Sequence, residues 1–259
     1  MNDEDRLILL IEEGRSEEAV EEADRILAQY PEALDIHIVR IRGFLELCRE
    51  DLALEALKAL PPSQPISSYY RADLLYDLGR FEESERFCDE YLERLPDQAE
   101  GLFLKGLLLE RHGEIRAADL MFQKAHRANP QVFGLPFRVG PERFEEIVDE
   151  ALAVLPREFR RLMDGLSVQI SSVVPEAMIG VQGEGLDPGC LATIDPDLGA
   201  GGTLHLFRVN IEHAFDSVES SVEIVRSLVM EEWADYLNLE PVEERSSDEK
   251  EFFEEEEIV

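Results

Sequence analysis

The sequence contains few cysteines and no long apolar run, and each scarcity excludes a class of protein. Cys48, Cys88 and Cys190 lie far apart and form no C-x-x-C pair, which excludes a disulfide framework and a thiolate zinc site. The first apolar run, Leu7 to Ile11, is too short for a signal peptide or a membrane span. We therefore expect a cytoplasmic protein in a reducing compartment that does not associate with a membrane.

Cations are also scarce. The chain has 25 lysines and arginines against 58 aspartates and glutamates, which gives a formal net charge of −33. The negative electrostatic field of such a charge repels phosphate groups, so nucleic acids and anionic membrane surfaces are excluded as partners. The 259 residues allow one large domain or two of ordinary size, with enough buried surface to be stable without disulfides.

Four prolines mark an internal repeat in the N-terminal half. Pro31, Pro65, Pro96 and Pro130 follow one another at intervals of 34, 31 and 34 residues. Residues of similar kind recur at fixed distances before each proline: a turn residue at seventeen, a small residue at twelve, and mostly apolar residues at eight and five. These are Gly14, Cys48, Gly79 and Gly113; Ala19, Ala53, Ser84 and Ala118; Ala23, Leu57, Cys88 and Phe122; and Ile26, Leu60, Tyr91 and Ala125.

A period of 34 residues with these positions resembles the tetratricopeptide repeat (TPR), in which each unit is a helical hairpin. The small residues let the two helices approach closely, and the proline ends the second helix. The resemblance implies an α-helical solenoid of about four units over residues 1–130, which exceeds the minimum of about three that such a stack needs. We expect Pro61-Pro62 to end the second helix of the second unit early.

In this repeat the first helix of each hairpin lines a concave groove that binds partners. Mapping the repeat onto the chain gives an apolar and aromatic groove with few cations, which favours an apolar or amphipathic protein segment over an acidic peptide. The alternative is that several of these residues simply pack between repeats. The groove residues are Ile8, Ile11, Ile38, Arg42, Leu45, Tyr69, Asp73, Tyr76, Phe103, Leu107 and Glu110.

Residues 131–140 lack helical periodicity and predict a linker to a second domain over residues 141–240. Apolar residues at helical spacing predict a helix from Pro141 to Leu155, and alternation predicts strands over 166–171 and 203–209. A final helix is expected over 217–239, so the whole chain should be mostly helical. Its expected inner face consists of Val218, Val222, Val225, Val229, Trp233 and Tyr236.

The order of these elements, with the short motifs in them, resembles a small family of minimal zincin-like metallopeptidases over about residues 141–239. The resemblance implies a small α+β domain in which the final helix carries the metal site and a sheet edge receives peptide. It rests on Phe144-Glu145-Glu146-Ile147-Val148, Ala151-Leu152, Leu155-Pro156, Met178-Ile179-Gly180-Val181, Glu184-Gly185 and Leu206-Phe207-Arg208 before Ile211-Glu212.

The final helix lacks the H-E-x-x-H motif by which such enzymes hold zinc and position a general base. Glu231 and Asp235 stand at the two histidine positions, Glu232 stands at the position of the base, and Pro241 stands at the third ligand. Carboxylates favour Mg²⁺, Ca²⁺ or Mn²⁺ over zinc, and three neighbouring acids repel one another. We therefore expect no cofactor and no catalysis.

Two alternatives remain for these acids: a weakly bound divalent cation at Glu231 and Asp235, or a metal-dependent peptidase with Glu232 as its base. His205 and His213 could in principle supply replacement ligands. Alternation along the strand predicts that His205 faces solvent, and His213 follows in a loop, so structural or incidental roles are expected for both, not metal ligation.

Residues 241–259 carry nine acids against two bases and predict a solvated, disordered tail. Taken together, the sequence predicts a cytoplasmic protein-interaction scaffold: a TPR groove joined to an inactive zincin-like domain. The alternatives are the peptidase and a bare assembly scaffold in which the C-terminal domain only caps the repeats.

Overall fold

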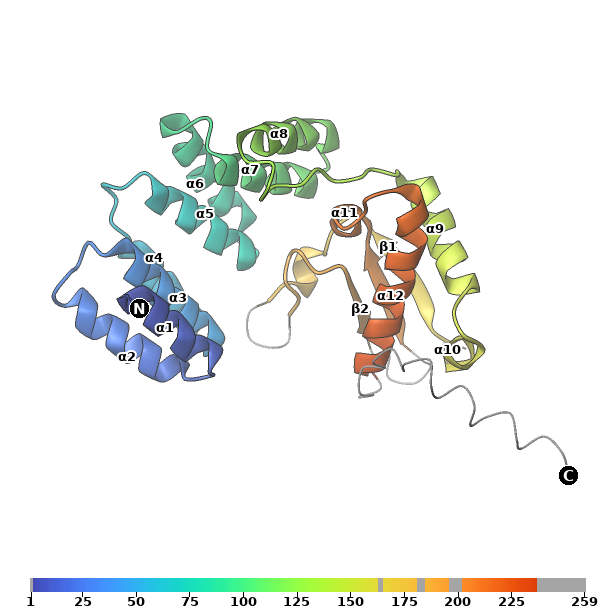
Figure 1. Cartoon of the computed structure of the whole chain (residues 1–259), viewed down its shortest axis with the longest axis horizontal. Coiled ribbons are helices and arrows are strands. Elements are labelled where there is room, and N and C mark those ends of the chain that lie inside the picture. Colours follow the sequence, from blue (N-terminus) through green and yellow to red (C-terminus); the bar gives the residue numbers. More distant parts are fainter. Residues whose placement is uncertain (1, 163–164, 181–184, 196–201, 237–259) are drawn as a thin grey trace, which may run out of the picture. The chain divides into compact units, whose positions relative to one another are not determined.

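The computed structural model describes residues 2–162, 165–180, 185–195 and 202–236, which are coloured along the chain in Figure 1. The described part is mostly helical, as the sequence predicted, and it contains a small three-stranded sheet. The chain divides into two compact units. The first comprises Met1–Arg138, Ser171–Cys190 and Phe207–Phe215, and the second comprises Val139–Ile170, Leu191–Leu206 and Asp216–Val259. The expected acidic tail lies outside the described residues.

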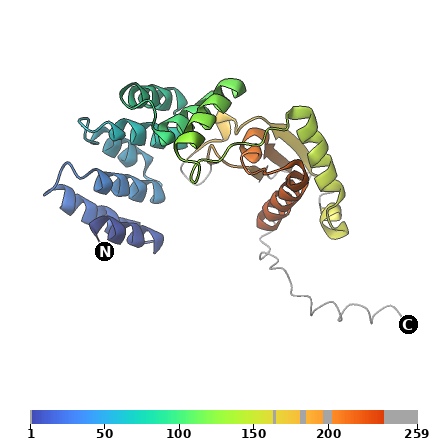
Figure 2. The same cartoon turned by 45° about the horizontal axis from the view of Figure 1, so that its top comes forward.

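Four helical hairpins follow one another in the first unit (Figures 1 and 2). They are α1 (Asp3–Glu12) with α2 (Ser16–Leu27), α3 (Leu34–Glu46) with α4 (Glu50–Lys58), α5 (Ile66–Asp77) with α6 (Phe81–Arg94), and α7 (Ala99–Arg111) with α8 (Ile115–Ala128). The second helix of the second hairpin, α4, ends before Pro61-Pro62 as expected and has nine residues, against fourteen in α6 and in α8.

The turn inside each hairpin has the same backbone geometry. Gly14, Cys48, Gly79 and Gly113 all have positive φ angles, between 53° and 76°. The residue after each of them donates its backbone N–H to the carbonyl five residues earlier, at 2.8–2.9 Å, which is the Schellman closure of a helix end. The turn positions read from the sequence are thus the positions where the chain needs a left-handed residue.

The other repeat positions are the buried faces of the helices. The small residues of the second helices are Ala19, Ala53, Ser84 and Ala118, and each is at most 1% exposed. The Ser84 hydroxyl donates to the Ala72 carbonyl at 2.6 Å, which joins the second helix of the third hairpin to the first. On α7, a Cβ built at Gly106 would lie 2.4 Å from the Phe122 ring, so the close approach of α7 and α8 depends on glycine there.

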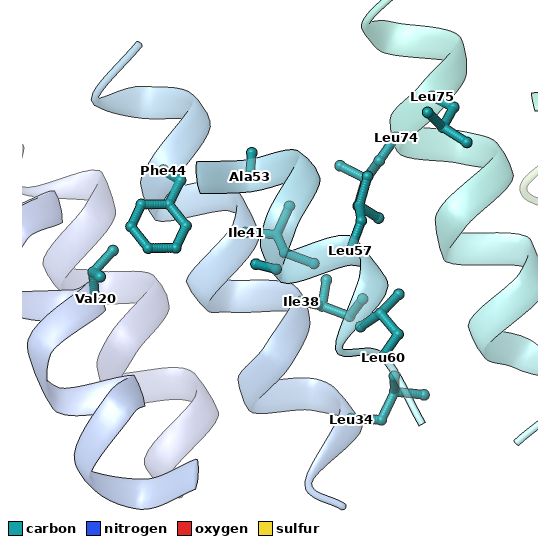
Figure 3. Close-up of a cluster of buried hydrophobic side chains, with 11 residues drawn as sticks. Val20, Leu34, Ile38, Ile41, Phe44, Ala53, Leu57, Leu60, Leu74 and Leu75 are labelled. Carbon is teal, nitrogen blue, oxygen red and sulfur yellow. The ribbon is translucent and has the colours of Figure 1, made fainter. Parts of the chain in front are cut away.

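An apolar cluster joins neighbouring hairpins along the stack. Figure 3 shows side chains of α2, α3, α4 and α5 that meet between the first and third hairpins. Leu57 and Leu60, at the end of α4 and just after it, contact this cluster together with Leu74 and Leu75 of α5. The cluster also contains Val20, Leu34, Ile38, Ile41, Phe44, Ala53 and Ala56.

Three segments that follow the last hairpin belong to the same unit, although the sequence assigned them to the linker and to the second domain. They are residues 131–138, the stretch 171–190 with a short helical turn, η1 (Glu176–Met178), and the stretch 207–215 with α11 (Arg208–Glu212). Arg111 of α7 donates to the Val174 carbonyl at 2.7 Å, and Ile179 packs against Gly79. Contacts of this kind connect positions far apart in the chain.

The second unit contains α9 (Pro141–Ala153), α10 (Arg157–Leu162), β1 (Ser167–Ser171), β2 (Ala192–Asp195), β3 (Thr203–Phe207) and α12 (Val218–Tyr236). The strand order is β1-β3-β2, and β2 runs antiparallel to β3 with Ala192 opposite Leu206. Hydrogen bonds pair Ser167 with Gly202 and Ser172 with Val209, so β1 and β3 run in the same direction. The helix α12 packs against α9 and β2.

The central strand differs from the expectation in two ways. The strand expected over 203–209 ends at Phe207, where α11 begins, and β2 was not expected at all. His205 was expected to face solvent, but it is 8% exposed, because a central strand is covered on both faces. None of the described helices is long and apolar enough to cross a membrane.

The turn geometry gives a first testable prediction. Gly113→Ala should lower the free energy of unfolding by about 1 kcal/mol, because the left-handed region costs an L-residue about 1–2 kcal/mol, partly offset in the unfolded chain. A Cβ at Gly113 would meet nothing within 4 Å, so backbone strain is the only cost. Gly134 also has open space around it but no positive φ, so Gly134→Ala is the matched control. Equal losses in urea denaturation of the two variants would contradict this assignment.

Candidate functional site

The final helix α12 carries Glu231, Glu232 and Asp235, the acids at which the sequence suggested a metal site. Val225, Val229 and Trp233 form its buried face, whereas Val218 and Tyr236, which were also expected there, are exposed at its two ends. The acids lie near the C-terminal end of this helix.

Of these acids, Glu231 and Asp235 are exposed and Glu232 is partly buried beside Trp233. Burial, together with the charges of Asp235 and Glu231, raises the pKa of Glu232 to about 7. The three carboxylates therefore repel one another. Within the described residues, no group of three or more His, Cys, Asp and Glu side chains is placed to hold a metal ion. The carboxylate set does not fit the zinc centre of the family, and we derive no catalytic step from it.

The expected groove residues fall into three classes of exposure. Arg42 is exposed, and Ile8, Ile11, Leu45, Tyr69, Asp73, Phe103 and Leu107 are partly buried. Ile38, Tyr76 and Glu110 are buried, so they pack inside the unit and offer a partner little surface. Ile38 and Tyr76 pack between repeats, which is the alternative stated for the groove residues, whereas Glu110 contacts Arg138 and His213 from outside the repeats.

The part of the expected groove that α3 and α5 form has polar groups at its centre. The Tyr69 hydroxyl donates to Asp73 Oδ1 at 3.4 Å, and its ring packs against Tyr70 and Tyr91 at centroid distances of 5.4 and 5.6 Å. Burial raises the pKa of Asp73, while the Tyr69 hydrogen bond and the charge of Arg42 oppose that shift. The third hairpin thus places a carboxylate beside aromatic rings, where the charge of Arg42 from α3 also acts on it.

At the equivalent positions of the last hairpin, the chain covers the face with its own segments. The ring of Phe103, which is equivalent to Tyr69, lies 5.1 Å from the ring of Phe133. The carboxylate of Glu110, which is equivalent to Tyr76, accepts a hydrogen bond from Arg138 and lies 3.1 Å from His213 Nε2. The last hairpin therefore holds an aromatic ring and a cation from segments outside the repeats.

Arg138 is the centre of a buried ion cluster that sequence reasoning missed. Its Nη1 donates to Glu212 at 3.2 Å, its Nη2 donates to Glu110, and Nε and Nη2 donate to Asp119 at 3.1 and 3.0 Å. Arg208 donates to the second oxygen of Glu212 at 2.8 Å. Glu110 is 3% exposed and Glu212 is 0% exposed. Burial lowers the pKa of Arg138, but the carboxylates Glu110 and Asp119 outweigh it, and the pKa is raised.

One signal in the sequence could have indicated this cluster. Arg138 is the only charged residue among residues 131–140, which are otherwise apolar or uncharged. A single cation in a chain so rich in acids needs a carboxylate partner if its segment packs against the protein. Which carboxylates it would meet depends on the fold.

The cluster predicts a large effect on stability. Arg138→Met should lower the free energy of unfolding by about 3–5 kcal/mol, because it removes the cation that buried carboxylates share. Arg143 is the matched control, since it pairs with Glu146 and Glu150 at 2.8 and 3.0 Å on the surface, where ion pairs contribute little. Chemical denaturation monitored by circular dichroism measures both variants. Equal stabilities of Arg138→Met and Arg143→Met would contradict the central role of Arg138.

The acids of α12 predict a pH effect. The pKa of Glu232 is about 7 in the folded protein, against an ordinary value of 4.5. The stability that the protonated carboxyl contributes is therefore fully present below pH 4.5 and is lost as the pH rises through about 7. Glu232→Gln should therefore unfold at a higher temperature than the native chain at about pH 8, with little difference at about pH 5. Trp233, the only tryptophan, reports the unfolding by fluorescence. A difference that is constant with pH would show that Glu232 has no such shift.

No protein-family model matches the chain, and no curated protein matches it at a significant level.

Proposed function

We propose that this protein is an interaction scaffold: residues 1–130 form a TPR-like solenoid that binds a partner protein, and residues 141–240 form a zincin-like module without catalytic histidines. The repeat supports the solenoid, because its positions coincide with buried helix faces and with left-handed turns in all four hairpins. The partner is an apolar or amphipathic protein segment.

The observation that carries the proposal is the face shared by α3 and α5. Arg42, Leu45, Tyr69 and Asp73 come from two successive hairpins and keep exposed surface. Together they combine aliphatic and aromatic contact area with one carboxylate and one cation. Such a surface binds an amphipathic segment through apolar contact and a few oriented polar groups.

The contacts of the last hairpin support the proposed chemical character of the partner. There the equivalent face packs against the ring of Phe133, and Glu110 accepts a hydrogen bond from Arg138. A partner segment with an apolar side chain and a basic residue nearby would make similar contacts, with Tyr69 in the place of Phe103 and with Asp73, about one helical turn before the position equivalent to Glu110, as the carboxylate. The net charge of −33 also favours a partner with basic residues.

The second unit supports binding more than catalysis. Glu231 and Asp235 are exposed, and within the described residues they form no group of three or more side chains placed to hold a metal ion. The rival function, a metal-dependent peptidase, needs a metal ion at Glu231 and Asp235 with Glu232 as base. Stoichiometric metal in protein purified without chelators, lost in Glu231→Ala and in Asp235→Ala, would favour the rival.

The groove is tested by selecting peptides from a displayed library on the full chain. The selected peptides should be rich in aromatic and aliphatic residues beside a basic one. Leu45→Glu should weaken their binding at least tenfold, which is about 1.4 kcal/mol, because it places a charge in the apolar contact. Leu120→Glu is the matched control, since Leu120 is an exposed leucine of α8. No selected peptide, or equal binding to both variants, would refute the groove.

A further inference from the structure

A cavity of about 420 Å³ lies between α4, α5 and α6. Its apolar walls are Leu54 and Leu57 of α4, Leu75 of α5 and Phe87 of α6. None of these residues belongs to the face of α3 and α5 described above. The cavity therefore differs from the proposed groove in its residues.

The early end of α4 explains why there is a cavity at this place. Elsewhere the second helix of a hairpin packs along the first helix of the next, as α2 does on α3 and α6 on α7. The short α4 packs less closely on α5. Arg71 of α5 caps the end of α4, donating from Nε to the Leu57 carbonyl at 3.2 Å and from Nη2 to the Leu60 carbonyl at 2.7 Å.

The rim of the cavity is cationic, which is unusual in a chain with more than two acids per base. Lys58, Arg71, Arg80 and Arg86 line it, against a single acid, Glu83. Glu83 is already engaged, because it accepts hydrogen bonds from Arg80. Lys58 pairs with Glu55, but both side chains are 74% exposed, so the pair is weak and exchangeable.

The guanidinium groups are also held at the apolar wall. Arg71 and Arg86 lie over the Phe87 ring at 5.7 and 4.9 Å from its centroid. This places two cations beside one aromatic ring, so that an occupant could contact the ring and an arginine at once.

The acids of α6 line a different strip, where Arg86 is accompanied by Glu82, Glu85, Asp89, Glu90 and Glu93. Three of those five have partners. Lys105 of α7 binds Glu85 and Asp89 at 3.0 and 2.6 Å, and the Ser68 hydroxyl donates to Glu90 at 3.0 Å. These three carboxylates are thus already paired within the protein.

We propose that this cavity is a second protein-binding site, which takes an acidic segment carrying a bulky apolar side chain. The apolar side chain packs against Phe87 and the leucines, and carboxylates on either side of it bind Arg86 and Lys58. Charge complementarity selects this occupant, because the cavity concentrates cations that are scarce in the rest of the chain. The site goes beyond the proposed groove, whose partner is apolar or amphipathic.

The test uses the full chain and a fluorescein-labelled peptide in which two phenylalanines are flanked on both sides by glutamates. Fluorescence anisotropy should show saturable binding that weakens with salt. Lys58→Glu with Arg86→Glu should weaken it at least tenfold. The matched control is Arg116→Glu with Lys124→Glu, which makes the same charge change at exposed residues of α8. A peptide with serines in place of the phenylalanines should bind at least tenfold more weakly.

Three outcomes would overturn the site: no binding in the micromolar range, equal loss in the control variant, or undiminished binding of the serine peptide. The chain's own Phe252-Phe253 lies between acids and has the same chemistry. Tighter peptide binding after Phe252→Ser with Phe253→Ser would support the cavity and identify this segment as a competing occupant. Because Lys58 and Arg86 lie outside the groove, failure here leaves the groove test unaffected.

Discussion

The buried guanidinium of Arg138 is the interaction on which the first unit depends beyond its repeats. It joins carboxylates of α7, α8 and α11 through Glu110, Asp119 and Glu212. Removing these charges from water costs several kcal/mol per ion, and only mutual hydrogen bonds offset that cost. The cluster therefore gives specificity to the packing of segments 131–138 and 207–215. An apolar contact would tolerate sliding, whereas a guanidinium with three acceptors fixes one arrangement.

The sequence predicted the hairpins because their determinants are local. A left-handed residue at each turn and a small residue on each second helix recur at a fixed period, and both have one structural meaning. It could not predict that residues 171–190 and 207–215 belong with the hairpins, since that depends on single contacts such as Arg111 with Val174. The same limit applies to the site: Glu110 was identified as a groove residue, but its buried partner lies 28 positions away.

The scarcity of cations makes each well-placed one informative. The chain has 25 bases against 58 acids. A cation that is buried, or that donates to the carbonyls at a helix end, therefore has a role beyond solubility. Arg138 neutralises interior carboxylates, Arg71 caps α4, and Lys105 bridges two acids of α6. Of the cations around the cavity, Lys58 and Arg86 have no buried structural partner among the described residues. That distinction is what separates a binding role from a structural one.

The two proposed surfaces differ in charge, and this makes specificity possible on a single scaffold. The groove presents one carboxylate, Asp73, and one cation, Arg42, whereas cations predominate around the cavity, where Lys58 and Arg86 disfavour a basic segment. The cavity thus rejects a basic partner by repulsion as well as by poor fit, which is how related interfaces avoid cross-binding. Exchanging the charges should exchange the preferences only partly, because the tyrosine surface and the leucine-lined cavity also differ in shape.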